Sequence, residues 1–274
     1  MSASHSASDV TDHRSVPVRD SAFTVQCRVL HALILRELKS RYGNRRLGFL
    51  WAAIEPMIFL SIFVAAFHLM GRTSQGGVAA PLFFIAGFSP FFMFRDVFSQ
   101  VTSGTRGQSS LLMFPQVTRM DILLSKVIVN SAVAILVFII FMIGLYCIGF
   151  HFNIDNPLGV VFGFGLMIAL GFGLGLVLGA ITIRYEFISS LTTPLMGRPL
   201  FFTSGLFFSA SMLPPKVREI FLYNPLLHCI EYIRASMFES FESRYIDLGY
   251  VGIFALVLIS FGLVLLGFFE RQRR

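Results

Sequence analysis

Six apolar runs of twenty or more residues constrain what this chain can fold into. Each run is long enough to cross about 30 Å of hydrocarbon as a helix. Because lipid offers no hydrogen-bond partners, a backbone that crosses it must satisfy its own N–H and C=O groups, as a helix does. Charged residues make up only 14% of the sequence, well below the usual share in soluble domains. We therefore predict an all-α integral membrane protein with six transmembrane helices, at 47–70, 79–99, 122–150, 157–183, 187–210 and 248–269.

The fifth predicted span is the least regular, because Pro194, Arg198 and Pro199 interrupt it. Lys and Arg are concentrated before the first span, after the second and at the C-terminus, and fewer lie in the opposite loops. Since cytoplasmic loops of membrane proteins carry the excess of Lys and Arg, both termini are predicted to be cytoplasmic.

The chain before the first span has two parts. Residues 1–22 are polar and Ser-rich, which is typical of a disordered cytoplasmic tail. Residues 23–46 repeat apolar side chains at helical spacing and end with Arg41, Arg45 and Arg46. This pattern predicts an amphipathic helix in the membrane interface, formed on Phe23, Cys27, Leu30, Ile34 and Leu38. The cations either only orient the chain or also bind an anionic substrate head group.

Two segments outside the spans have mixed character. The loop 102–121 carries a short apolar cluster, Leu111 to Phe114, which either docks a soluble partner or packs on the inner face of the bundle. The pattern of residues 211–247 predicts two short amphipathic helices, which are either re-entrant or periplasmic. Asn224 is expected to cap the second helix, with Pro225 at its first position. They form either an outer gate or a cap without a gating role.

On that second helix, one predicted face is apolar and another is polar. His228, Glu231 and Arg234 are spaced three residues apart, so they can pair along the helix. The apolar face consists of Leu226, Ile230, Ile233 and Met237.

Glu55, Arg95 and Arg198 are charged residues within predicted spans, where charge is costly and usually has a partner or faces water. Glu55 and Arg95 lie at comparable depth, which favours an ion pair. Arg198 has no acidic residue at its depth and is a candidate for a cation lining an anionic path. Among the aromatic residues, the amphipathic Trp51, Tyr223 and Tyr232 near the two mouths are the best candidates for contacting sugar.

Three glycines, Gly171, Gly175 and Gly179, form a small-residue ridge in the fourth span. Such a ridge lets another helix approach closely. We favour a helix of the same subunit over a helix of a second copy.

Several kinds of chemistry have no signature here. The sequence contains no Gly-Lys pair, so it has no Walker A loop for ATP, and no Asp-x-Asp pair. The three cysteines lack metal-ligand spacing. We therefore predict no catalytic residue, no metal site and no cofactor on this chain, and no nucleic-acid partner.

Four motifs in register resemble one known family. They are LRELKSRYGNRRLGFLWAAIEP, FIAGFSPFFMF, LLMFP and YNPLLHCIEYIRASMF, and the resemblance covers residues 23–274. The chain resembles ABC-2 type permeases that export polysaccharides, most closely the capsular polysaccharide exporters of Gram-negative bacteria. Exporters of O-antigen and teichoic acid are nearby relatives.

This resemblance implies a permease without enzyme activity that serves capsule biogenesis in the bacterial inner membrane. It implies a homodimer bound to two copies of a cytoplasmic ABC ATPase, which would hold the ATP and Mg. The substrate would be an acidic, lipid-linked polysaccharide, passed to a periplasmic co-polymerase and an outer-membrane export protein. Segment 211–247 would be the gate, and the loop 102–121 would couple to the ATPase through Arg106, Leu111, Leu112, Met113, Phe114 and Arg119.

Taken together, these observations predict a substrate path that involves Arg41, Arg45, Arg46, Trp51, Glu55, Arg95, Arg198, Tyr223, His228, Glu231, Tyr232 and Arg234. Two other classes of protein compete with this prediction. A secondary transporter or channel would need an inverted repeat or an acid relay in its spans, and neither is evident. A membrane-embedded enzyme acting on lipid-linked sugar would need an acid/base pair, for which His228 with Glu231 is the only candidate.

Overall fold

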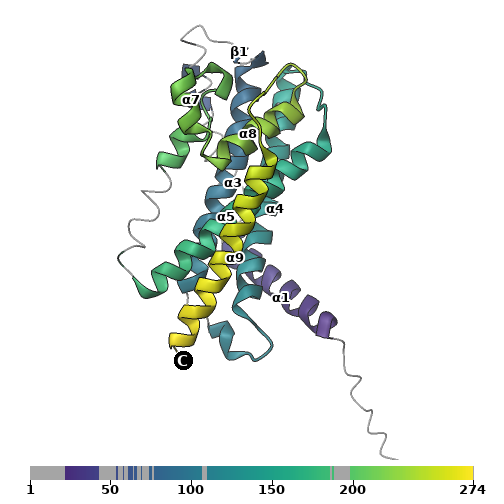
Figure 1. Ribbon diagram of the computed structural model, residues 1–274. Coiled ribbons are helices and arrows are strands. Elements are labelled where there is room, and N and C mark those ends of the chain that lie inside the picture. Colours follow the sequence, from purple (N-terminus) through teal and green to yellow (C-terminus); the bar gives the residue numbers. More distant parts are fainter. Residues whose placement is uncertain are drawn as a thin grey trace, which may run out of the picture.

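In the computed structural model, long helices pack side by side, and several short elements gather at one end of them (Figure 1). The structure describes residues 22–42, 54, 58, 61–63, 65–66, 69, 74–75, 77–106, 110–185, 187 and 198–273. The helices are α1 (Ala22–Tyr42), α3 (Ala80–Arg106), α4 (Arg119–Ile148), α5 (Pro157–Arg184), α7 (Pro215–Phe221), α8 (Pro225–Met237) and α9 (Leu248–Arg273). Two 3-10 helices, η1 (Ser110–Met113) and η2 (Ala210–Met212), and an antiparallel pair of two-residue strands, β1 (Ser74–Gln75) and β2 (Val78–Ala79), complete the elements.

Four of the described helices are long and apolar enough to cross a membrane. They cover Ala80–Thr105, Arg119–Ile148, Pro157–Arg184 and Leu248–Phe269. These four correspond to the predicted second, third, fourth and sixth spans. The predicted first span, 47–70, lies mostly outside the described residues, and so does 188–197 of the fifth.

The described part of the fifth span differs from the prediction of a helix that continues to residue 210. Residues 198–203 are helical, and the chain then turns. Gly205 adopts a φ of 74°, in the left-handed region that favours glycine. The helix therefore ends at residue 203, and residues 204–209 form an irregular link to η2.

Local signals define the ends of α4 and α5. Thr118 and Asp121 form a reciprocal capping box at the start of α4. Gly149 ends α4 with a φ of 105°, and its N–H donates to Leu145 and Tyr146 carbonyls. The Asn156 side chain caps α5, with Pro157 at its first position.

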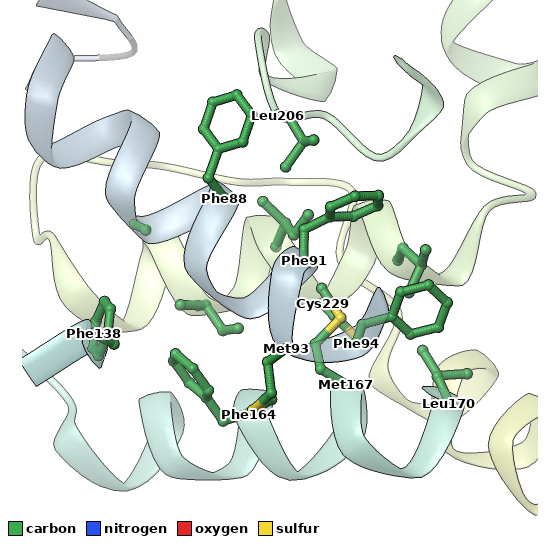
Figure 2. Close-up of a cluster of buried hydrophobic side chains, with 14 of the residues drawn as sticks. Phe88, Phe91, Met93, Phe94, Phe138, Phe164, Met167, Leu170, Leu206 and Cys229 are labelled. Carbon is green, nitrogen blue, oxygen red and sulfur yellow. The ribbon is translucent and has the colours of Figure 1, made fainter. Parts of the chain in front are cut away.

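Helix α3 lies at the centre of the bundle, between α4 and α5, and α5 packs in turn against α9. Figure 2 shows Met93 and Phe94 of α3 near Met167 of α5 and Cys229 of α8, while Phe88 of α3 lies near Leu206. This buried cluster joins α8 to the long helices.

The glycine ridge of α5 faces α3. A Cβ atom at Gly171 would lie 2.9 Å from the Phe94 carbonyl oxygen, and one at Gly179 would lie 2.2 Å from Thr105 Oγ1. Since real Cβ atoms do not approach so closely, these glycines allow the two helices to touch. Close packing within one subunit, the preferred interpretation of the ridge, is confirmed.

The short elements define two ends of the molecule. β1, α7 and α8 lie at the top of Figure 1, and we call this the α8 end. α1 and the C-terminus lie at the bottom, which we call the α1 end.

Helix α1 packs on the start of α4. Leu33 is buried there, and Glu37 lies 3.8 Å from Lys126 Nζ. Three residues of the predicted apolar stripe, Phe23, Cys27 and Leu38, are exposed instead. Leu30 and Ile34 of the stripe are half-buried, so only part of the stripe points away from the bundle, and its insertion into the membrane interface remains a prediction.

Candidate functional site

Helix α8 is fixed at its start by Asn224, as the sequence predicts. The Asn224 side chain accepts a hydrogen bond from Leu226 N at 3.0 Å, and Pro225 occupies the first helical position. Asn224 Nδ2 also donates to the hydroxyls of Thr203, at 2.9 Å, and Ser204, at 3.2 Å. The same side chain thus caps α8 and holds the end of the 198–203 helix.

The predicted apolar face of α8 is buried in full. The residues of this face, whose spacing brings them onto one side of the helix, are Leu226, Ile230, Ile233 and Met237. Since α8 also carries buried polar side chains, it is enclosed on more than one side.

Arg234 is completely buried and binds backbone carbonyl groups. Its Nη1 donates to Gly205 O at 2.7 Å and Phe208 O at 3.4 Å, and its Nη2 donates to Leu206 O at 3.1 Å. Its Nε donates to Phe83 O of α3 at 3.3 Å. The carbonyl groups of Gly205, Leu206 and Phe208 belong to the irregular link after the 198–203 helix, so Arg234 compensates for the hydrogen bonds that the broken helix loses.

The guanidinium stays charged in this position. Burial lowers the pKa of Arg234 to about 9, and the nearby carboxylate of Glu231 opposes the shift. Since 9 lies above neutral pH, Arg234 carries its proton and donates from every nitrogen named above.

Glu231 is also buried and joins two loops. Its Oε1 accepts from Ala210 N of η2 at 3.1 Å, and its Oε2 accepts from the hydroxyl of Ser243. The carboxylate therefore ties the segments before α7 and before α9 to α8.

His228 binds the backbone on both sides of its ring. Asp247 N donates to Nδ1 at 3.1 Å, so the proton of the neutral ring is on Nε2, which donates to Leu222 O at 2.8 Å. The ring thus joins the turn after α7 to the start of α9.

The predicted pairing of His228, Glu231 and Arg234 with one another is wrong. None of the three forms an ion pair or hydrogen bond with another, because each side chain binds the backbone of a neighbouring segment. Helix α8 is therefore a hub that connects α3, the link 204–209, η2, the turn after α7 and the start of α9.

Other candidates near the α8 end are less enclosed. Tyr223 is exposed, and its carbonyl accepts a hydrogen bond from Tyr250 Oη at 2.8 Å. Tyr232 is half-buried and packs edge-on against Phe162 with ring centres 6.2 Å apart. Arg198 is exposed, and it lies in the helical residues 198–203.

Arg95 lies in the middle of α3, and its side chain is about half exposed. It pairs with Asp96 at 3.2 Å and lies over the Phe92 ring at 4.8 Å. Its predicted partner Glu55 lies outside the described residues, as do Arg45, Arg46 and Trp51, while Arg41 is described only in its helical backbone.

At the α1 end, η1 presents the apolar cluster predicted from the sequence. Met113 and Phe114 are 85% and 61% exposed, Leu112 is exposed and Leu111 is half-buried. We call Leu112, Met113 and Phe114 the η1 knob. Its exposure favours the docking interpretation over packing on the bundle.

The base of the η1 knob is held by polar contacts. Arg119 Nη1 donates to Thr105 O at 2.6 Å, which closes the loop between α3 and α4. The side chain of Arg106, the other predicted cation of this loop, is not among those that the structure describes.

Sequence reasoning missed two residues of this framework. Asp121 accepts hydrogen bonds from Thr118 and from Gln26 of α1, and its sequence signal was the capping-box spacing from Thr118. Gly87 of α3 faces Arg234, since a Cβ there would lie 2.4 Å from Nη2. Nothing in the sequence alone brings residues 87 and 234 together. Among the described residues, no three His, Cys, Asp or Glu side chains are grouped as a metal site.

Comparisons with known proteins point to one class of transporter. The sequence profile of a family described as "ABC-2 type transporter" matches residues 28–238. The chain is 29% identical to the polysialic acid transport protein KpsM of Escherichia coli, over 89% of this chain and 95% of that protein. It is 30% identical to the capsule polysaccharide export inner-membrane protein CtrC of Neisseria meningitidis serogroup B, over 91% and 94% of the two chains. It is 27% identical to the corresponding BexB of Haemophilus influenzae, over 91% and 94%.

Proposed function

Because this chain belongs to the ABC-2 type transporter family, we propose that it is the permease subunit of an ABC exporter for a capsular polysaccharide. The observation that carries this proposal is the end-to-end similarity to three capsule or polysialic acid export proteins, which covers about nine tenths of each chain. The η1 knob and helix α8 both lie within residues 28–238, the region that matches the family.

The energy for export would come from a separate cytoplasmic ATPase, to which ATP and Mg bind. The η1 knob supports this part of the proposal, because exposed apolar side chains next to a polar loop are typical of a docking surface. On this assignment the α1 end faces the cytoplasm, in line with the Lys and Arg distribution that predicts cytoplasmic termini.

Force applied at the η1 knob would reach the bundle through its base. Arg119 binds the last turn of α3, and Asp121 binds both the start of α4 and Gln26 of α1. A movement of the knob therefore acts on three helices, of which α3 runs the length of the bundle to the α8 end.

At the other end, α8 and the segments bound to it would act as the gate for the polymer. Two copies of the chain and of the ATPase would form the transporter, and the cations after α1, Arg41, Arg45 and Arg46, would bind the anionic head of a lipid-linked polymer. The buried backbone bonds of His228, Glu231 and Arg234 support positioning roles rather than sugar contacts. A co-polymerase and an outer-membrane export protein would receive the polymer.

The η1 knob offers the sharpest test. We expect Met113→Asp and Phe114→Asp to abolish co-purification of the co-encoded ATPase and to remove surface polysaccharide, while the permease remains in the membrane. Ile220→Asp, at a residue 69% exposed at the α8 end, serves as the matched control for ATPase binding.

A deletion strain gives the second measurement. We expect loss of surface polysaccharide and its accumulation inside the cell, with both effects reversed by the wild-type gene. Normal surface polysaccharide in the deletion strain, or full ATPase binding by both knob variants, would contradict the proposal.

A further inference from the structure

The exposed surface of α3 is polar, although α3 has the length and composition of a membrane span. Within Ala80–Thr105 the exposed side chains are Arg95, Asp96, Ser99 and Ser103. Residues 95, 99 and 103 are four apart, so they lie along one face of the helix. We call these four residues the α3 polar stripe, and it extends from the middle of the span to the α1 end.

The other described spans expose apolar side chains instead. Leu124, Ile128, Ile135, Ile139 and Ile143 form the open face of α4. The open faces of α5 and α9 are also apolar apart from Ser260 and, at the ends of these helices, Arg184 and Arg271. Lipid chains require such an apolar surface, and the exposed surface of α3 differs because it is polar.

Lipid chains are a poor neighbour for the α3 polar stripe. Charged and hydroxyl groups lose their hydration in hydrocarbon, so charged and polar faces of spans turn to water or to protein. The stripe is also nearly neutral, because Arg95 and Asp96 are paired at 3.2 Å. Its neighbour Phe92 lies under the Arg95 guanidinium at 4.8 Å and is half-buried.

We propose that the α3 polar stripe is the wetted wall of the cytoplasmic half of the polymer path, and that it binds the hydroxyl groups of the chain rather than its charge. This inference rests on the proposed function and adds to it the residues and the chemistry of recognition. A paired Arg and Asp offer both donors and acceptors, serine hydroxyls offer both in one group, and the Phe92 edge offers an apolar surface for a sugar ring. Such a wall accepts neutral and acidic sugars alike.

Water access can be measured with single cysteines in the full transporter, in membranes. Cys27 and Cys147 are first replaced by serine, and buried Cys229 is retained. Ser99→Cys and Ser103→Cys are then compared with Ile128→Cys and Ile139→Cys, which are 41% and 45% exposed on the apolar face of α4. Because thiols react as thiolates, which require water, we expect a charged methanethiosulfonate to modify the two α3 positions about tenfold faster or more.

The presence of polymer separates the two parts of the inference. In membranes from a strain that synthesises the polysaccharide, we expect slower modification at residues 99 and 103 than in membranes from a strain that does not. Equal rates on α3 and α4 would overturn the wetted wall, and fast but unprotected modification would overturn polymer binding. Either result leaves the deletion phenotype unaffected, so it can be told apart from a failure of the proposed function.

The recognition chemistry has its own test. Asp96→Asn keeps hydrogen-bonding groups, whereas Asp96→Leu removes them. We expect export of both a neutral and an acidic polymer to fall at least about fivefold in the leucine variant. In the asparagine variant, export should be largely retained, because recognition depends on hydrogen bonds rather than on net charge. Equal loss in both variants, at equal amounts of permease in the membrane, would contradict recognition through hydroxyl groups.

Discussion

The guanidinium of Arg234 lies 3.5 Å from the centre of the Phe83 ring, while its nitrogens donate to carbonyl groups of residues 205, 206 and 208. The same nitrogens occupy the space that a side chain at Gly87 would fill. One arginine therefore joins α8 to α3 and completes the hydrogen bonding of a broken helix.

Arg234→Ala should lower the stability of the permease by more than about 3 kcal/mol, because several buried carbonyl groups lose their donor. Gly87→Ala should also destabilise, since the new methyl group displaces Arg234. Thermal unfolding in detergent measures both effects. Arg244→Ala is the control, since Arg244 and Glu242 form a solvent-exposed pair 3.6 Å apart, and it should change stability little.

Gly175→Val should separate α3 from α5 and cost about 1–3 kcal/mol by overpacking. A Cβ atom at Gly175 would lie 2.7 Å from Val101 Cβ, whereas one at Gly165 of the same helix meets no atom within 4 Å. Gly165→Val is therefore the matched control. Equal melting temperatures of the two variants would show that the glycine ridge is not needed for packing.

Asp121→Ala should loosen the α1 end, because it removes the acceptor shared by Thr118 and Gln26. Loss of the capping box alone typically costs about 1 kcal/mol. We expect faster hydrogen exchange in α1 and in the first turn of α4, measured by mass spectrometry. Asp155→Ala, at an exposed residue just before α5, should leave exchange in both regions unchanged.

Cys229 should resist alkylation in the folded protein. Burial raises the pKa of its thiol to about 12, because the thiolate would lose its hydration, so the reactive form is scarce at pH 8. Mass spectrometry after N-ethylmaleimide treatment should find Cys27 modified and Cys229 unmodified. Both should react after unfolding, and rapid modification of native Cys229 would contradict the buried position of α8.

The sequence predicted the features that depend on local pattern. Run length located the four described spans, and Asn224 with Pro225 located the start of α8. The spacing of Gly171, Gly175 and Gly179 also predicted close helix contact, which the structure confirms.

Features that depend on contacts between distant residues could not be predicted in this way. The spacing of His228, Glu231 and Arg234 suggested pairs along α8, but tertiary packing brings backbone groups from other segments closer. The end of the helix at residue 203 escaped prediction for the same reason, because the donor that stabilises the break lies on α8. The polar face of α3 was missed because the packing of the other helices, which the sequence does not show, decides which residues of α3 stay exposed.

The position of Arg234 also determines the order in which the chain can mature. The carbonyl groups of Gly205, Leu206 and Phe208 precede their donor by 29, 28 and 26 residues. Because the chain is made from its N-terminus, these three carbonyl groups are synthesised before the side chain that binds them. This end of the molecule therefore reaches its final conformation only after α8 has been made and has packed against α3 and the link 204–209.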